Sequence, residues 1–385
     1  MRRNNSYDVA VVGAGVFGAW TAYTLQRAGQ KVVLLDAFGP GNSRSSSGDE
    51  SRVIRTGYGT DEIYSRMAIR SLELWKRFCA ETRLPLFYQT GVLWMAVQDD
   101  AYVSKIQATL VKLGVRHERL EREELDARFP QVNWSDVEWG LLETESGALV
   151  ARRAVAAVVE EACRAGAEYR TEAVVEPQGK GKLNEVRTAR GEAIRASSFV
   201  FACGPWMGKV FPRVVGERIF ATRQEVFYFG VPAGEARFAP PAMPVCICIT
   251  SEEMYSIPDL EGRGFKVAHD RRGPPFDPDA EDRVVTGEGL AHVRAYLAKR
   301  FPAMKDAPVA ETRVCQYENT WSGDFLIDRH PELENVWLVG GGSGHGFKHG
   351  PAVGEFVAQR VIQGGATEQR FALGTKDKRA ARGVY

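Results

Sequence analysis

The sequence predicts an α/β fold, with α+β character in one part, in which a parallel sheet is interrupted by an antiparallel one. Residues 7–36 have the pattern of a strand, a glycine-rich turn, a helix and a second strand. Residues 336–364 repeat the order of strand, glycine loop and helix near the other end of the chain. Residues 224–270 contain short strands separated by turns, without crossover helices, which is typical of an antiparallel sheet.

The glycine-rich turn of the first stretch predicts a dinucleotide-binding site. Gly13, Gly15 and Gly18 complete the pattern G-x-G-x-x-G between an apolar strand and a helix. The first glycine allows a tight turn, the second lets the backbone approach a pyrophosphate, and the third lets the helix pack closely on the strand. Asp36 ends the next strand, where a carboxylate accepts hydrogen bonds from ribose hydroxyls and repels a 2′-phosphate. FAD or NAD is therefore favoured over NADP.

The composition excludes several classes of partner. A chain of 385 residues, 44% of them hydrophobic, is long enough for about two or three domain-sized units with full cores. Lysine and arginine (50) balance aspartate and glutamate (49), so no overall field favours nucleic acid or an anionic membrane, and we predict neither partner.

The N-terminus lacks an apolar signal region and no apolar run is long enough to span a bilayer, which predicts a cytoplasmic protein. The six cysteines lack C-x-x-C and zinc-ligand spacing, so neither a disulfide scaffold nor a metal is predicted.

A second domain is predicted to be inserted after the first helices. Residues 37–55 form a long polar loop, either a solvated connection or a loop that wraps a cofactor or an anionic substrate with its serines and arginines, Arg44 among them. An amphipathic helix follows at 60–78. Strand character at 89–97, helices at 101–113 and 122–129, and a turn-rich strand at 140–150 then depart from the alternation of strand and helix.

The chain returns to dinucleotide-domain character twice. A helix at 151–165 and two strands precede the antiparallel stretch, and an amphipathic helix around 290–297 follows that stretch. The glycine loop after the strand at 336–339, with the helix at 351–364, offers backbone donors to another part of the same cofactor. Such donors suit the negative N1–C2=O edge of a reduced flavin. We predict a discontinuous nucleotide-binding domain of residues 1–88, 147–218 and 320–385, and a substrate domain of residues 89–146 and 219–319.

Five motifs together resemble a known family. GDESRVIR (48–55), ACGPW (202–206), RVCQYENT (313–320), DFLIDRHP (324–331) and GSGHGFK (342–348) follow the opening glycine motif in this order. The sequence is similar in them to the monomeric sarcosine oxidase group of FAD-dependent amine oxidases, which includes the N-methyltryptophan and pipecolate oxidases. The resemblance covers nearly the whole chain and thins at 98–137 and in the final tail. It implies a Rossmann-like FAD-binding domain with an inserted antiparallel-sheet substrate domain.

The resemblance implies a specific cofactor and reaction. FAD would be attached through a thioether between Cys315 and the flavin 8α-methyl, a small amine substrate would lose a hydride equivalent to it, and O2 would reoxidise it to give hydrogen peroxide. The family is mostly monomeric, which predicts a monomer. Without the resemblance, a single cysteine followed by polar residues would be read as a buried structural residue. The implied cofactor-binding residues are Gly13, Ala14, Gly15, Val16, Phe17, Gly18, Asp36, Ala37, Ser46, Ser47, Arg52, Val174, Ala202, Cys203, Gly204, Trp206, Cys315, Gly342, Gly344, His345, Gly346, Phe347 and Lys348.

The resemblance also assigns the predicted catalytic residues. Lys266 corresponds to the lysine that contacts the flavin edge and assists the reaction with oxygen, and Arg52 to an arginine close to the flavin ring. Strand alternation places Lys266 opposite Phe265 and Val267, so the lysine can face the flavin if those two meet the core. Tyr317 matches an aromatic position of the substrate cavity.

Three further residues are implied to bind the substrate. Arg55 and Lys348 correspond to two cations that hold a substrate carboxylate, one through a two-pronged fork and the other as a point charge. Their presence favours an amino acid over a simple amine. Tyr255 matches a second aromatic position of the cavity, although either tyrosine is equally consistent with a plain core residue.

The chain departs from the family pattern at two places. Ser46 and Ser47 stand where the sarcosine and methyltryptophan oxidases have two adjacent histidines, and the pipecolate branch also carries serines there. One extra residue precedes Arg52, so the alignment of this loop is open by one position. His349 occupies a position where a small or apolar residue is expected, a change that would reshape the substrate cavity.

Besides an oxidase of secondary amino acids, the sequence is compatible with three functions. A fructosyl amino acid oxidase would share the fold and the covalent cysteine, and would also cleave a secondary C–N bond. An NAD-dependent dehydrogenase would account for the glycine motif and Asp36, but for neither Cys315 nor the late glycine loop. A flavin-containing binding subunit without turnover would leave Lys266 and Arg55 without a role.

Overall fold

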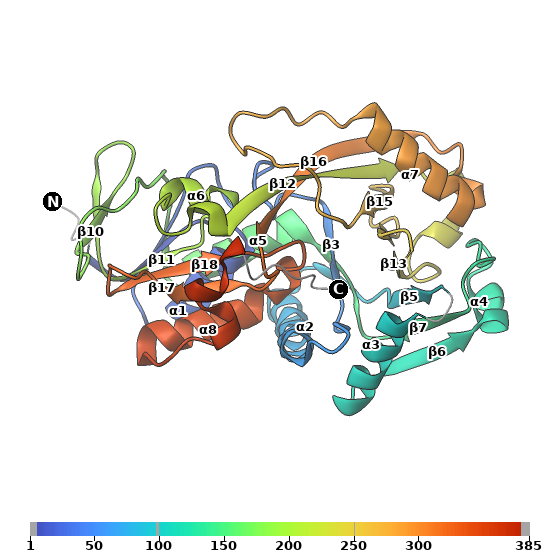
Figure 1. The fold of residues 1–385 in the computed structure, drawn as a ribbon, viewed down its shortest axis with the longest axis horizontal. Helices are drawn as coiled ribbons and strands as arrows, with labels where there is room; N and C mark the ends of the chain where they lie inside the picture. The colour runs from blue at the N-terminus through green and yellow to red at the C-terminus, as the bar shows by residue number, and fades with distance from the viewer. Residues whose placement is uncertain (1–5, 98–99, 250, 379–385) are drawn as a thin grey trace.

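The structure is a computed structural model that describes residues 6–97, 100–249 and 251–378. Residues 1–5 and 379–385, the outer ends of the predicted nucleotide-binding domain, therefore lie outside the described residues. The described chain is built around two sheets with helices on their faces (Figure 1). Its α-helices are α1 (Val16–Arg27), α2 (Glu62–Thr82), α3 (Ala101–Lys112), α4 (Arg122–Arg128), α5 (Ala151–Arg164), α6 (Met207–Val210), α7 (Gly287–Arg300) and α8 (Gly350–Gln363).

The first sheet has seven strands and a parallel centre. Its order is β17-β18-β11-β1-β2-β9, with β10 paired to β11, and the pairings from β18 across to β9 are parallel. The antiparallel strands β17 and β10 lie beside this parallel part. The strands are β1 (Ser6–Val12), β2 (Val32–Asp36), β9 (Glu168–Thr171), β10 (Glu185–Arg187), β11 (Ala193–Phe201), β17 (Leu326–Arg329) and β18 (Val336–Gly340).

Both faces of this sheet are covered, which explains the apolar run of β1. Val9 and Val11 pack into a cluster with α1, α2, α5 and α8, whereas Ala10 and Val12 face a second cluster on the side of α6. A parallel strand that is buried on both faces needs a nearly continuous apolar sequence. α1 and α8 lie side by side although they come from opposite ends of the chain (Figure 1).

The second sheet has eight strands in the order β16-β12-β15-β14-β13-β5-β7-β6. Its pairings are antiparallel except for β13 with β5, which is parallel. These two strands come from the two separate segments of the predicted substrate domain, so no hairpin imposes an antiparallel pairing on them. The strands are β5 (Val92–Ala96), β6 (His117–Glu121), β7 (Trp139–Glu143), β12 (Ile219–Phe229), β13 (Val245–Cys248), β14 (Met254–Ile257), β15 (Phe265–His269) and β16 (Val309–Thr320).

The long strands β12 and β16 connect the two halves of the molecule. They pair in antiparallel register from Ile219 opposite Thr320 to Phe229 opposite Val309. In Figure 1 this pair runs from the side of α6 to the side of α7 and β15. The predicted fold class, an α/β domain combined with an antiparallel sheet, is thus confirmed, whereas the residue boundaries between two domains stay a prediction.

One segment differs from its predicted structure. The polar stretch 37–55 is predicted as a loop throughout, but its end forms β3 (Ser51–Ile54). β3 pairs with β8 (Gly147–Val150) in a three-stranded sheet completed by β4 (Phe87–Tyr88). The strand depends on a partner far away in the sequence, which a local pattern does not reveal. Among the residues described, no helix combines the length and the apolar character needed to cross a bilayer.

Candidate active site

A cavity of about 320 Å³ lies where the parallel strands of the first sheet end. Val12, Asp36, Ala202 and Val339 line it, and each stands at or just beyond the carboxyl end of its strand, where open α/β sheets bind ligands. Most residues predicted to bind the cofactor line this cavity. They are Gly13, Gly15, Val16, Phe17, Asp36, Ala37, Ser46, Ser47, Arg52, Val174, Ala202, Cys203, Gly204, Trp206, Gly342, Gly344, Gly346 and Phe347.

The opening glycine loop has the close contacts that the motif predicts. Gly13 has a φ of 104°, and a Cβ on it would lie 2.2 Å from the carbonyl oxygen of Ala202. A Cβ on Gly18 would lie 1.8 Å from the carbonyl oxygen of Gly13, so the third glycine lets α1 rest directly on the turn. Gly18 does not line the cavity; its place in the predicted set is explained by this packing.

Asp36 is held by the backbone in a position that leaves it facing the cavity. Its Oδ2 accepts a hydrogen bond from Ala14 N (2.7 Å), and its Oδ1 accepts from Phe38 N and Gly39 N (both 2.8 Å). A carboxylate has about four acceptor sites, and one on Oδ2 is left for a hydroxyl in the cavity. Ala14, predicted to contact the cofactor, is thus placed to orient Asp36.

The cavity wall also contains polar atoms that the described protein leaves without partners. Ser46 Oγ and Gln316 Oε1 are buried and have no hydrogen-bond partner within the described residues. Buried polar atoms are normally satisfied, so these two indicate a ligand. A cavity with glycine turns, the N-terminus of α1 and a ribose-type carboxylate fits FAD, and the residues present are therefore consistent with this cofactor.

A second, smaller cavity of about 50 Å³ adjoins the first. The two cavities share Arg52, Tyr317, Gly344 and Phe347 in their walls. The predicted substrate-binding residues Arg55, Lys348 and Tyr255 all line the smaller cavity, together with His345. The structure therefore brings every predicted substrate residue next to the cofactor cavity.

Lys348 and Arg55 are buried cations at one end of this small cavity. Lys348 Nζ donates to Tyr58 Oη and to the carbonyl oxygen of His345 (both 2.9 Å), which leaves the third of its donors for a ligand. Burial, and then the charge of Arg55, hold the pKa of Lys348 well below its usual value. A bound carboxylate would offset this cost of burial. The guanidinium of Arg55 lies over the rings of Tyr58 (4.3 Å) and Trp94 (4.8 Å) and donates to the carbonyl oxygen of Gly57.

The unexpected His349 is explained by the same cluster. Its Nε2 lies 2.8 Å from Tyr58 Oη, the hydroxyl that accepts from Lys348. Burial and the neighbouring Lys348 hold the pKa values of His349 and His345 well below the usual range, so both rings are neutral. Neither ring therefore adds a charge to the site. His349 contacts the hydroxyl that binds Lys348, and it is not among the residues that line the small cavity.

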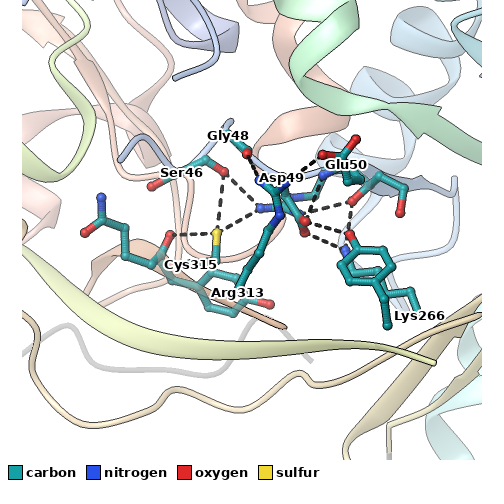
Figure 2. Close-up of polar contacts among 12 residues, drawn as sticks. Ser46, Gly48, Asp49, Glu50, Lys266, Arg313 and Cys315 are labelled. Atoms are coloured by element: carbon teal, nitrogen blue, oxygen red, sulfur yellow. Dashed lines mark hydrogen bonds and ion pairs between the residues drawn. The ribbon is translucent and has the colours of Figure 1, made fainter. Parts of the chain in front are cut away.

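A buried ion cluster lies between the predicted catalytic lysine and the predicted flavin-linking cysteine. Figure 2 shows Asp49 between Lys266 and Cys315. Asp49 accepts from Lys266 Nζ (2.6 Å), from Tyr228 Oη (2.6 Å) and from the guanidinium of Arg52. Burial alone would raise the pKa of Asp49, but the charges of Lys266 and Arg52 outweigh it and hold that pKa well below its usual value.

Lys266 is connected to the wall of the cofactor cavity by the contacts of this cluster. Phe265 and Val267 point into the core and Lys266 points the other way, as the strand alternation predicts. Its ammonium binds Asp49 and the carbonyl oxygen of Ser51 (2.8 Å), and Asp49 in turn binds Arg52, which lines both cavities. Burial lowers the pKa of Lys266 to about 8, against the opposing effect of Asp49.

Cys315 lies beside the wall of the cofactor cavity. Arg52 Nη2 donates to Sγ (2.9 Å) and also to the carbonyl oxygen of Ser46 (3.0 Å). Cys315 as a whole is 7% exposed. Ser47, in place of a family histidine, uses its hydroxyl to accept from Val16 N at the start of α1 (3.1 Å).

Three buried carboxylates of the site are not identified by the sequence patterns. Glu318 lines the cofactor cavity, Asp49 binds Arg52 in the wall of both cavities, and Glu143 is buried next to the backbone that follows Arg55. Glu143 accepts from Thr56 N (2.6 Å) and Gly57 N (3.0 Å), and so holds the loop that follows Arg55. A local signal exists for Asp49 and Glu318, since both stand within motifs that the family resemblance singles out.

Glu318 lines the cofactor cavity at the late glycine loop. Its Oε1 accepts from Gly342 N (3.3 Å), and its backbone oxygen accepts from Ser343 N (2.8 Å). Burial raises the pKa of Glu318 to about 7. The backbone N–H of Gly342, one of the donors predicted to face the cofactor, therefore binds the Glu318 carboxyl instead.

Comparison with known proteins gives one consistent result. Three curated relatives span nearly the whole chain: the monomeric sarcosine oxidase of Bacillus sp. strain NS-129 (32% identical; 93% of each chain), the peroxisomal sarcosine oxidase of Homo sapiens (30%; 91% of each chain) and the N-methyl-L-tryptophan oxidase of Salmonella arizonae (27%; 93% of this chain, 95% of the other). Among solved structures, L-proline dehydrogenase from P. horikoshii has a TM-score of 0.84 (23% identical; 98% and 99% covered). The fructosamine oxidase of Aspergillus fumigatus has a TM-score of 0.79 (22% identical; 99% and 92% covered), and both likenesses show the fold.

The family comparison identifies the cofactor class. The family described as FAD dependent oxidoreductase matches residues 8–360, which include both glycine loops and the residues around the two cavities. With a match of this extent, and a fitting cavity at the strand ends, the chain belongs to the FAD dependent oxidoreductase family.

Proposed function

We propose that this protein is an FAD-dependent oxidase of secondary, N-alkyl amino acids, of the sarcosine-like or pipecolate-like kind. The observation that carries the proposal is the small cavity that adjoins the cofactor cavity and has Arg55 and Lys348 in its wall. Two buried cations next to the cavity that would hold FAD suit a substrate with a carboxylate. The relatives that match most of the chain include oxidases whose names specify sarcosine and N-methyl-L-tryptophan.

The residues of the small cavity divide the work of binding. Arg55 and Lys348 hold the carboxylate, while Tyr255 and Tyr317 flank the space left for the N-alkyl group. A carboxylate held by these two cations would bring the C–N bond of the substrate to the shared wall of the two cavities. FAD bound in the larger cavity would supply the acceptor for the hydride of that bond, and O2 would take the electrons with release of hydrogen peroxide.

Lys266 is proposed to assist the reaction with O2, although Arg52 stands between it and the cavity. Its charge belongs to a buried cluster that places Lys266 and Arg52 on one carboxylate. Two cations for one anion leave the cluster with net positive charge, which would stabilise negative charge developing on oxygen.

We further propose a thioether between FAD and Cys315. The sulfur lies next to Arg52 and the backbone of Ser46, both in the wall of the cofactor cavity. Acid precipitation tests the bond, because only a covalently attached flavin stays with denatured protein. Yellow colour in the pellet supports the thioether, and yellow colour in the supernatant contradicts it.

A substrate panel with peroxide release as readout tests the activity. We expect N-methylglycine or a cyclic secondary amino acid to react, the matching amines without a carboxylate to react far less, and sugar-modified amino acids not to react. If only the sugar-modified amino acids reacted, the protein would be a fructosyl amino acid oxidase instead. That function has less support, because the fructosamine oxidase of similar structure shares 22% identity, which shows the fold alone.

Absorbance spectra distinguish an oxidase from a binding subunit and from a dehydrogenase. A non-catalytic flavin-binding subunit would keep its visible flavin absorbance when substrate is added without oxygen, whereas an oxidase bleaches. An NAD-dependent dehydrogenase would show no flavin absorbance, and membership of the FAD dependent oxidoreductase family sets that function aside. We propose a monomer, as the name monomeric sarcosine oxidase says of two Bacillus relatives, and light scattering in solution tests it. The cytoplasmic location and the division into two domains stay predictions.

A further inference from the structure

Asp270 adds a carboxylate to a cavity otherwise lined by cations. It follows β15 directly, and its backbone N–H donates to the carbonyl oxygen of Glu253 (2.7 Å), which fixes the chain where the strand ends. Among the described residues that line the small cavity, Asp270 is the only acid, beside Arg52, Arg55 and Lys348. Its Oδ1 accepts a hydrogen bond from Tyr317 Oη (3.0 Å), so the carboxylate meets the tyrosine that both cavities share.

The charges around Asp270 come from several elements. Arg55 follows β3, and Lys348 lies in the 3-10 turn Phe347–His349. Tyr255 comes from β14, Tyr102 from α3 and Tyr317 from β16. The charges of Asp270 and of the buried Glu143 both oppose the effect of Arg55 on the pKa of Lys348, so these charged groups act on Lys348 together. His269, the last residue of β15, interacts with Arg271 and His292 instead.

This arrangement matches a zwitterion better than an anion. The wall of the small cavity contains Arg55, Lys348 and Asp270, together with Arg52, which also binds Asp49, so a ligand there meets charges of both signs. An amino acid in water is a carboxylate with an ammonium group next to it, and a site with cations alone would repel that ammonium. Asp270 supplies the charge that the ammonium requires.

We propose that Asp270 binds the ammonium group of the amino acid substrate and accepts its proton, so that the enzyme takes the zwitterion from solution. This inference rests on the proposed function of the site. Only an amine with a free electron pair can give up hydride from its neighbouring carbon. One N–H bond of the ammonium therefore breaks, one O–H bond forms on the Asp270 carboxylate, and the neutral amine remains with its carboxylate on Arg55 and Lys348. Nothing is oxidised or reduced in this step.

The pH dependence of Asp270→Asn separates this role from a structural one. Without the carboxylate, only the anionic form of the substrate, with its amine already neutral, binds well. The kcat/KM of the variant should be lower than that of wild-type holoenzyme by about tenfold or more at pH 7. The gap should close as the pH approaches the pKa of the substrate amine. An equal loss at every pH would overturn the inference.

The controls use the same readouts. Asp306→Asn removes an acid whose side chain is 88% exposed and should leave kcat/KM unchanged at every pH. Flavin absorbance and the melting temperature report whether Asp270→Asn is folded and loaded. If wild-type enzyme oxidises no N-alkyl amino acid, the proposed function fails. If it does and the gap does not depend on pH, only the role of Asp270 fails.

A measurement on the wild-type protein decides the question if the variant does not fold. Trimethylglycine and 3,3-dimethylbutanoate have the same shape, but the first has a permanently positive nitrogen where the second has carbon. Neither can be oxidised by loss of hydride next to a free amine. Perturbation of the flavin spectrum should show tighter binding of trimethylglycine. Equal binding, tighter binding of 3,3-dimethylbutanoate, or binding of neither would overturn the inference.

Discussion

Arg52 Nη2 lies 2.9 Å from Cys315 Sγ, which places a guanidinium from β3 against a sulfur from β16. These strands belong to different sheets, so cation and sulfur meet only in the folded protein. The same guanidinium binds Asp49, and through it Arg52 is linked to Lys266. The predicted attachment point and the predicted oxygen-activating lysine thus share one buried arginine.

Cys315→Ala should release the flavin from acid-denatured protein. Wild-type protein should keep its yellow colour in the acid pellet, and the variant should lose it to the supernatant, because denaturation breaks every non-covalent contact. Cys163→Ala removes an exposed thiol and should behave like the wild type. Colour retained in the pellet of Cys315→Ala would place the attachment elsewhere.

Lys266→Met should slow the reaction with O2 by about two to three orders of magnitude and change flavin reduction by much less. Stopped-flow measurement of the two half-reactions gives both rates. In wild-type protein the lysine charge is present below its pKa of about 8 and lost above it, so the rate with O2 should fall as the pH rises through that value. The variant should lack this fall, and Lys305→Met, at an exposed position, should retain it. Equal losses in both half-reactions would contradict the proposed role.

Arg55→Ala should raise KM and lower kcat/KM, because the substrate carboxylate loses a buried partner. The loss of transition-state stabilisation should be about 2 kcal/mol or more. The kcat/KM of Arg55→Lys should lie between those of the wild type and Arg55→Ala, since lysine keeps the charge but not the two-pronged geometry. Flavin content should stay at the wild-type level, as measured by absorbance. Arg66→Ala, with an exposed side chain, is the matched control. An unchanged KM would move the carboxylate site away from Arg55.

Glu318→Gln should remove a pH dependence of stability from flavin-free protein. The pKa of this carboxyl rises from 4.5 to about 7 on folding, so the folded state binds more protons and its stability falls as the pH rises between these values. The loss amounts to at most about 3 kcal/mol. In a Cys315→Ala background stripped of flavin, Glu318→Gln should be the more stable protein at pH 8. The advantage should vanish below about pH 4.5, as thermal melts would report. A constant difference across this range would rule out titration of Glu318.

The cofactor cavity could be predicted largely from local sequence. Gly13, Gly18 and Asp36 lie within one strand-helix-strand unit, so backbone geometry alone brings them together. The substrate cavity could not be derived this way, because Arg55, Tyr255 and Lys348 come from distant segments and are assigned through the family resemblance alone.

The buried acids were the least predictable part. Glu143 is recognisable only by its partners, and Asp49, although it lies in a motif of the family resemblance, is shown to be a buried ion-pair partner only by residues of other elements. Sequence patterns indicate whether a residue is polar, but burial and charge pairing depend on tertiary packing. The strand β3 escapes prediction for the same reason, since its partner β8 follows much later in the chain.

The long pair of β12 and β16 limits how a substrate can reach its site. Residues paired from Ile219–Thr320 onward cross from one half of the molecule to the other, and Cys315 and Tyr317 lie within that ladder. A hinge motion that separates the two halves would disrupt the backbone hydrogen bonds between β12 and β16, and this would cost free energy. We therefore expect the entry of substrate and the release of product to depend on side chains and loops around the small cavity, with little change in how the two sheets are joined.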